Sequence, residues 1–421
     1  MNKNIVNEIG INKISIKKAY YISYLMCFAL FSLQILPSDV LLFAAIAIFI
    51  FSPMDTTPYL FIISLPWSEV GKFSFGITLS LIQTSIYILK IVLVKKKLTM
   101  RVIDIVTVVY LMLIGIVNLL VYSSLNGISM VLYFIIATQL FYTYIMRFAD
   151  KDDTWKLLLL SLLISVVFAT IYGLRTGTSL ERWVSGSGYV MQLYGTLGTT
   201  RFGMYICICL VFELFYIKKP WLKVLLCTIT TVGVLATLSM TALLIMVFIY
   251  IYYFCVVVNS VSVRQKVAII LGILIFLILF ICYWPVIRGA SFVQPVVNRL
   301  ENIYSYSQQG DMDRVFTGRV SLGNEYMEKF FNSSLVNKIF GSASYALDSA
   351  SNYSHNSFID MLNYCGIIGC IIFGLLQICR IFQYKKTILF HPIFLVKLIV
   401  SIVGTTVSMF SAQFWLIWFY M

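Results

Sequence analysis

A titratable ring and three polar side chains stand at the start of a strongly apolar segment. His355, one of only two histidines in the chain, lies in the stretch SHNSFIDMLNYCGIIG (354–369). Asn356, Asp360 and Asn363 follow at i, i+4 and i+7, which places them on one helical face. Polar side chains are costly inside a membrane, so this face should point to a cavity or to other helices. The alternative for His355 itself is an interfacial ring that caps the helix.

Arginines form the second candidate set. On the side of the membrane predicted below to be outside, arginine outnumbers lysine. These outer residues are Arg175, Arg182, Arg201, Arg288, Arg299, Arg314 and Arg319, against Lys72, Lys329 and Lys338. A guanidinium is a fixed fork of donors that binds phosphate in a bidentate way. The bias indicates an anionic ligand outside, with acidic lipid headgroups and ion pairs to outer Asp and Glu as the alternative.

One of these arginines should open a helix. The stretch DRVFTGRVSLGNEYMEKFF (313–331) predicts a helix from about Gly318, with Leu322, Tyr326 and Phe330 on one face. Arg319 then lies in the first turn, beside backbone N–H groups that also favour an anion. A solvated arginine on an interfacial amphipathic helix is the alternative.

The elements that carry these residues must be membrane helices. Hydrophobic residues make up 60% of the 421 residues, charged residues 11%, and the mean hydropathy is +0.93. A soluble domain could not bury that much apolar surface, so we expect an all-α, polytopic integral membrane protein. The net charge of +14 is explained by topology, so we expect no nucleic-acid partner.

We expect about 12–14 transmembrane helices, since a span needs about 20 apolar residues. The apolar segments lie near 19–36, 39–53, 57–67, 74–94, 102–122, 128–146, 156–174, 201–217, 222–238, 240–258, 266–285, 357–378, 388–404 and 407–420. The third is too short to cross alone and could be re-entrant. The predicted units are N-terminal helices (1–174), an outer loop (175–200), central helices (201–285), a large outer loop (286–356) and C-terminal helices (357–421).

Charge orients this layout. With both termini in the cytoplasm, most of the 31 basic residues fall in short cytoplasmic loops, as the positive-inside rule requires. Sites for metal or cofactor are not expected. No nucleotide-binding or zinc motif occurs in the right context, and the two histidines, His355 and His391, fall on opposite faces of the membrane.

Several motifs together resemble a known family. SHNSFIDMLNYCGIIG resembles the His-Asn signature of the bacterial O-antigen and capsule polymerase and O-antigen ligase family, which follows the large outer loop. ERWVSGSG (181–188), LATLSMTALLIM (235–246) and TGRVSLGNEYMEKF followed by KIFGSA resemble three other family segments, in the expected order. The resemblance covers about half the chain, roughly 175–369. Met240 departs from it, because many members carry a basic residue there.

The resemblance implies a glycosyltransferase of GT-C architecture on the outer face of the bacterial inner membrane. Its donor would be a glycan on undecaprenyl pyrophosphate, transferred with inversion and without a metal or other cofactor. By motif, Arg182 and Arg319 would hold the pyrophosphate, and His355 would orient or deprotonate the acceptor hydroxyl. Further substrate contacts would come from Arg201, Arg314, Asn356 and Asp360, and Asp360 could instead fix the histidine.

A repeat-unit polymerase is the predicted function. It would transfer the growing glycan to a new lipid-linked repeat, with a chain-length regulator and a flippase as implied partners. An O-antigen ligase, which transfers the glycan to lipid A-core, is the alternative. A lipid-linked oligosaccharide flippase is a more distant alternative, because it should have short outer loops and basic residues along a lumen within the membrane.

Overall fold

The computed structural model is helical throughout the residues that it describes. These are 3–67, 78–93, 100–123, 126–140, 152–176, 199–237, 239–260, 294–311, 319–342 and 356–383, with short stretches between 262 and 290. No β-strand occurs among them, which confirms the all-α prediction. The spans expected at 388–404 and 407–420 lie outside the described residues, and most of 266–285 does too.

The described part of the first half of the chain forms eight helical elements. They are α1 (Lys3–Ser32), α2 (Ser38–Phe51), α3 (Thr57–Ser64), the short 3-10 helix η1 (Leu65–Trp67), α4 (Leu79–Leu93), α5 (Val102–Tyr122), α6 (Asn126–Leu140) and α8 (Asp152–Thr176). The second half adds α10 (Thr199–Tyr216), α11 (Pro220–Ala236), α12 (Met240–Ser260), α14 (Gln294–Gln308), α16 (Arg319–Asn332), α17 (Leu335–Phe340) and α18 (Ser357–Gln383).

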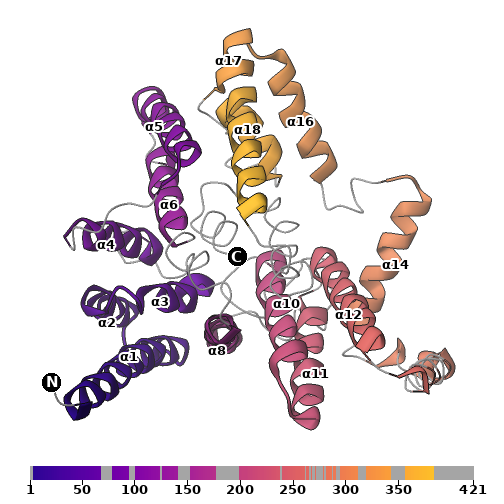
Figure 1. The fold of residues 1–421 in the computed structure, drawn as a ribbon. Coiled ribbons are helices and arrows are strands. Elements are labelled where there is room, and N and C mark those ends of the chain that lie inside the picture. The colour runs from indigo at the N-terminus through magenta and orange to yellow at the C-terminus, as the bar shows by residue number, and fades with distance from the viewer. Residues whose placement is uncertain are drawn as a thin grey trace.

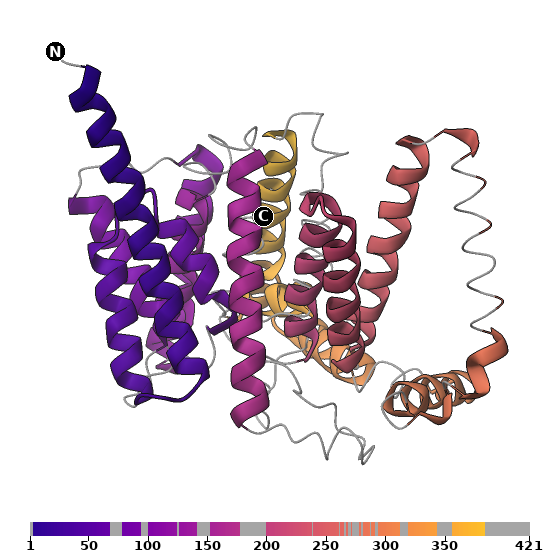
Figure 2. The ribbon, with the colours of Figure 1, turned by 90° about the horizontal axis from the view of Figure 1, so that it is seen from below.

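Most of these helices stand side by side. Seen from the side, the longer ones have roughly parallel axes, and α14 lies across the end of the molecule opposite to the start of α1 (Figure 2). Viewed along the bundle, α1 to α6 occupy one part of the molecule and α10 to α12 another. The helices α16, α17 and α18 lie together (Figure 1). The arrangement is that of a helical bundle with α14 at its edge (Figure 1).

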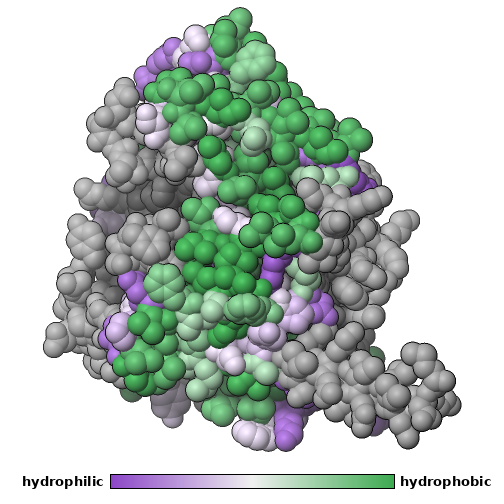
Figure 3. Space-filling model, turned by 90° about the vertical axis from the view of Figure 1, so that its left-hand side faces the viewer, coloured by the Kyte–Doolittle hydropathy of each residue, from purple (hydrophilic) through white to green (hydrophobic). Residues whose placement is uncertain are grey.

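The outer surface of the bundle is apolar. Val102, Leu113 and Leu120 of α5 are 78%, 59% and 77% exposed, and Val224 of α11 is 66% exposed. One side of the molecule, turned to the viewer in Figure 3, is hydrophobic over much of its described surface. Within the described residues, two helices are long and apolar enough to cross a membrane, Val102–Tyr122 and Phe358–Cys379. Apolar patches of this extent are typical of a lipid-facing surface.

The short third segment is buried among other helices. Leu60, Ile63 and Trp67 of α3 and η1 are fully buried, and the Trp67 ring stacks on Phe28 of α1 with centroids 5.2 Å apart. A helix of this length rises only about 12 Å and cannot cross a bilayer alone. The segment therefore fills the interior of the bundle between α1, α4 and α8.

Two lysines hold helix ends together. Lys90 of α4 donates to the carbonyls of Phe49 and Ser52 at the end of α2, at 2.6 Å each. Lys223 donates to the carbonyl of Leu214 in the last turn of α10, at 2.7 Å. A cation at a helix C-terminus binds the carbonyls that have no partner within the helix. The predicted topology puts both lysines and both helix ends on the cytoplasmic side, and that topology stays a prediction.

Candidate functional site

The start of α18 is fixed by Asn356. Its side-chain oxygen Oδ1 accepts hydrogen bonds from the backbone N–H groups of Phe358 at 3.0 Å and Ile359 at 3.4 Å. Asparagine is a favoured residue at this position because it satisfies N–H groups that lack a helical partner. His355 immediately precedes this cap in the sequence and lies outside the described residues. The cap therefore belongs to Asn356, while the prediction that Asn356 contacts substrate stays a prediction.

The polar stripe faces other helices, as predicted. Asp360 is 1% exposed and Asn363 is 5% exposed. The Asn363 side-chain amide donates to the carbonyl of Tyr326 on α16 at 3.2 Å and to that of Ile359 at 3.0 Å. A buried amide is stable only when its hydrogen bonds are satisfied, so Asn363 ties α16 to α18. Asp360 lies one turn closer to the start of α18.

The helix α16 is amphipathic, as its sequence predicts. Tyr326 is fully buried and Phe330 is 7% exposed, on the face that packs against α18. A Cβ built on Gly323 would lie 3.5 Å from Cδ1 of Ile359, an ordinary packing distance. Gly323 of α16 contacts Ile359 of α18. Tyr326, three residues later on α16, contacts Asn363, four residues later on α18. The two helices are therefore parallel where they touch, and their N-terminal ends lie at the same end of the pair.

This register determines where the predicted site residues stand. Arg319 is the first residue of α16, one turn before Gly323, and Asn356 precedes α18, one turn before Asp360. These contacts therefore place the start of α16 beside the start of α18, and the two helices lie together in Figure 1. The side chain of Arg319 lies outside the described residues, as do Arg182, Arg314 and His355 entirely.

Arg201 is placed on another element. It is in the first turn of α10, a helix that packs against α8, α11 and α12. Its side chain also lies outside the described part of the structure. The expected contact of Arg201 with phosphate stays a prediction.

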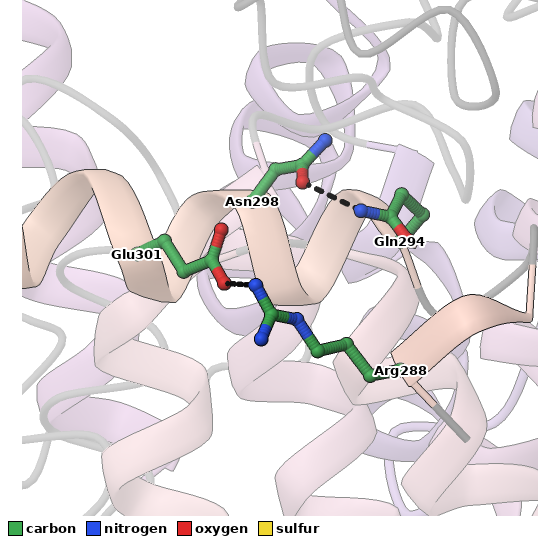
Figure 4. Close-up of polar contacts among 4 residues, drawn as sticks. All are labelled: Arg288, Gln294, Asn298 and Glu301. Atoms are coloured by element: carbon green, nitrogen blue, oxygen red, sulfur yellow. Dashed lines mark hydrogen bonds and ion pairs between the residues drawn. The ribbon is translucent and has the colours of Figure 1, made fainter. Parts of the chain in front are cut away.

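One outer arginine has an acidic partner. Nη2 of Arg288 lies 2.5 Å from Oε1 of Glu301 on α14, and the two side chains are 54% and 51% exposed (Figure 4). On the same helix, Gln294 donates to Asn298 at 3.0 Å. An exposed ion pair of this kind contributes little to stability. For Arg288, the ion-pair alternative explains the residue without a ligand.

The sequence did not reveal a joint that lies after the polar stripe, where the end of α17 meets a break in α18. Gly366 has φ 65° and ψ −171°, which breaks the helical path of α18. The Tyr110 hydroxyl of α5 donates to the carbonyl of Cys365 at this break, at 2.6 Å, and to that of Phe340 at the end of α17, at 3.1 Å. The Phe-Gly motif (340–341) and the end of the His-Asn motif thus meet at one tyrosine. Glycines in both motifs were the available signal, but no pattern pointed to Tyr110.

A close crossing of α5 and α6 supports the same joint. A Cβ on Gly127 of α6 would lie 2.6 Å from Cα of Gly115 on α5 and 2.6 Å from Oη of Tyr364 on α18. Small residues let helix backbones approach closely in membranes. Three helices therefore pack around Gly127, and this packing supports the region of α18 just before its break.

A buried acid lies away from this region. Glu213 of α10 is 1% exposed, and its Oε1 accepts a hydrogen bond from the Thr230 hydroxyl of α11 at 2.7 Å. Its Oε2 has no hydrogen-bond partner among the described residues. Sequence reasoning gave Glu213 no role, because a single acid within an apolar run matched no motif.

Two further searches, for metal-binding side chains among the described residues and for related proteins, gave no match. In the part of the chain that the structure describes, no group of three or more His, Cys, Asp or Glu side chains is arranged to hold a metal ion. Comparison with models of protein families, with curated proteins and with solved structures finds no match to this chain.

Proposed function

We propose that the chain is a membrane-embedded glycan polymerase. It would transfer a growing glycan from a polyprenyl pyrophosphate to a new lipid-linked repeat unit, on the outer face of a bacterial inner membrane. Support for membrane insertion comes from the apolar surfaces of α5 and α11 and from the two helices of sufficient length. Support for the chemistry comes from the four motifs that resemble the polymerase and ligase family, in family order.

The parallel packing of α16 and α18 is the observation that carries this proposal. It brings the start of α16, at Arg319, beside the start of α18, which Asn356 caps, although the two lie more than thirty residues apart in the chain. Two helix N-termini at one place present the positive ends of two helix dipoles, which favours an anion such as pyrophosphate. Asp360, which is buried one turn into α18, would supply a carboxylate close to these N-termini.

The proposed reaction is a displacement at the anomeric carbon. The acceptor hydroxyl oxygen attacks this carbon, the bond from carbon to the pyrophosphate oxygen breaks, and the configuration inverts. His355 takes the proton of the hydroxyl, and a carboxylate such as Asp360 would keep the imidazole oriented. Arg319 and Arg182 stabilise the negative charge that develops on the leaving pyrophosphate. In this proposal Arg201 and Arg314 assist in binding the phosphates.

Reconstitution tests the proposal directly. The purified full-length chain in liposomes, supplied with undecaprenyl-pyrophosphate-linked repeat units, should form a ladder of polymer without any other protein. No polymer from an active preparation, but transfer to added lipid A-core, would show a ligase instead. Movement of the lipid-linked repeat across the bilayer without any new glycosidic bond would show a flippase.

Topology is a second test. A periplasmic reporter fused within 300–350 should be active, and a cytoplasmic reporter fused after Met421 should be active. A cytoplasmic location for 300–350 would put α16 on the wrong side of the membrane for a lipid-linked donor presented outside. That result would overturn the proposed site.

A further inference from the structure

The three most exposed residues of the short helix α17 are all apolar. Leu335, Val336 and Phe340 are 71%, 64% and 49% exposed. Phe331, at the end of α16, is 63% exposed and adds to these apolar side chains. The sequence places these residues in a long outer loop, where water would be the expected solvent. Apolar side chains gathered on one helix of a loop usually have an apolar partner.

The depth of α17 is fixed by its contact with α5. At 1.5 Å per residue, Cα of Tyr110 lies about 12 Å from the Val102 end of α5 and about 18 Å from the Tyr122 end. The Tyr110 hydroxyl binds the carbonyl of Phe340 at 3.1 Å. Even with the reach of a tyrosine side chain, the end of α17 lies alongside α5 rather than beyond it.

The neighbouring face of α5 is apolar as well. Leu113, Val117 and Leu120 of this helix are 59%, 47% and 77% exposed. Among the described helices, α5 is one of two that are long and apolar enough to cross a membrane. The Phe340 end of α17 therefore lies alongside a helix whose exposed apolar surface suits contact with lipid.

The backbone around α17 suits a site without water. The Ser334 hydroxyl accepts from the N–H of Asn337 at 3.2 Å, and the N–H of Gly341 donates to the carbonyl of Asn337 at 2.8 Å. The N–H of Ser342 donates to the carbonyl of Asn363 at 3.0 Å. Irregular backbone at membrane depth is tolerated where protein groups satisfy it, and these three hydrogen bonds contribute to that.

We propose that α17 is a re-entrant helix within the bilayer, and that Leu335, Val336 and Phe340 contact the acyl chains of membrane lipid. The backbone turns at the end of this helix, at Gly341, where φ is 88°. The loop predicted at 286–356 is then only partly aqueous. This inference needs the membrane insertion of α5 and α18 and is independent of the glycan chemistry.

Photocrosslinking tests the contact in the intact protein. Benzoylphenylalanine is introduced at Val336 of the full-length chain, which is reconstituted in liposomes of phosphatidylethanolamine and phosphatidylglycerol. Val117 of α5 is the lipid-facing control, and Gln309, exposed after α14, is the aqueous control. After irradiation, phospholipid adducts are measured by intact mass spectrometry, and fragmentation locates the attachment on the lipid.

Position 336 should yield adduct as position 117 does, and roughly tenfold more than position 309, because hydrocarbon surrounds only the first two. The attachment should lie on an acyl chain. A yield at 336 no higher than at 309, or attachment only to the headgroup, would overturn the proposal. If size-exclusion chromatography shows that the variant at 336 is misfolded, the same comparison is made with benzoylphenylalanine at Leu335, and its result tests the proposal.

Discussion

Gly341 and Gly366 lie backbone against backbone, and each has a positive φ, 88° and 65°. A Cβ on Gly341 would lie 2.7 Å from the carbonyl carbon of Cys365, and a Cβ on Gly366 would lie 2.7 Å from that of Ile339. The end of α17 and the break of α18 are therefore one joint, which fits only residues without a side chain. This joint holds the two motifs of the candidate site in register.

Gly341→Ala and Gly366→Ala should each destabilise the protein strongly. A left-handed backbone costs an alanine about 1–2 kcal/mol, and overpacking adds about 1–3 kcal/mol. Thermal unfolding in detergent, followed by tryptophan fluorescence, measures the loss.

Two other glycines separate these causes. Gly310 has φ 71° but nothing within 4 Å of a built Cβ, so Gly310→Ala should show the backbone cost alone. Gly374 of α18 has open space and no positive φ, so its alanine variant should be neutral or slightly stabilising. Equal losses at 341, 366 and 374 would contradict a packed joint.

Tyr110→Phe should loosen the same joint. The change removes one hydroxyl and leaves the carbonyls of Phe340 and Cys365 without this donor, at a cost of about 1–3 kcal/mol. Tyr122→Phe is the matched control, because the Tyr122 hydroxyl makes only a long contact of 3.4 Å with the carbonyl of Ser342. When thermal unfolding of the two variants is compared, Tyr110→Phe should lose more stability than Tyr122→Phe. The reverse order would contradict the role of Tyr110 in the joint.

Asn363→Asp should separate α16 from α18. The substitution keeps the shape but replaces a donor amide with a carboxylate oxygen that faces the carbonyls of Tyr326 and Ile359. The expected cost is about 1–3 kcal/mol or more, because buried acceptors then face each other. Asn298→Asp, on the exposed face of α14, is the control and should change unfolding little. Limited proteolysis between 312 and 318 should increase only in the Asn363 variant.

Arginine identity should matter only where phosphate is bound. Arg319→Lys and Arg182→Lys keep the charge but lose the bidentate geometry. Each should slow polymerisation, because it should remove about 2–4 kcal/mol of transition-state stabilisation. Arg288→Lys is the matched control, because Arg288 pairs with Glu301 on the surface. Wild-type polymer from the Arg319 variant, at normal expression, would show that Arg319 contacts lipid headgroups or sets topology and does not hold the pyrophosphate.

Hydrophobic spacing predicted the start of α18 and the apolar face of α16, and the cost of polar groups in lipid predicted that the polar stripe turns away from lipid. Neither the near-complete burial of Asp360 nor the helix α14 was predicted. The capping role of Asn356 was not anticipated, because the sequence does not show whether its side chain bonds to its own helix or to a ligand.

The joint could not be predicted, because it depends on contacts between distant residues. Tyr110 lies more than 200 residues before Phe340 and Cys365, and nothing in its own helix marks it. A glycine such as Gly366 reads as a small packing residue in the sequence, whereas its backbone breaks the helix. The short helix α17 reads as part of an aqueous loop, because six residues carry too little periodicity to indicate depth.

The most direct test of the account is the product distribution of His355→Ala. Loss of a general base typically slows a reaction by about 10²- to 10⁴-fold, so a deletion strain carrying this variant should make no polymer and accumulate single lipid-linked repeats. The protein should remain inserted and folded, and His391→Ala should give the wild-type ladder. A wild-type ladder from His355→Ala would show that the ring has no catalytic role and would contradict the proposed reaction.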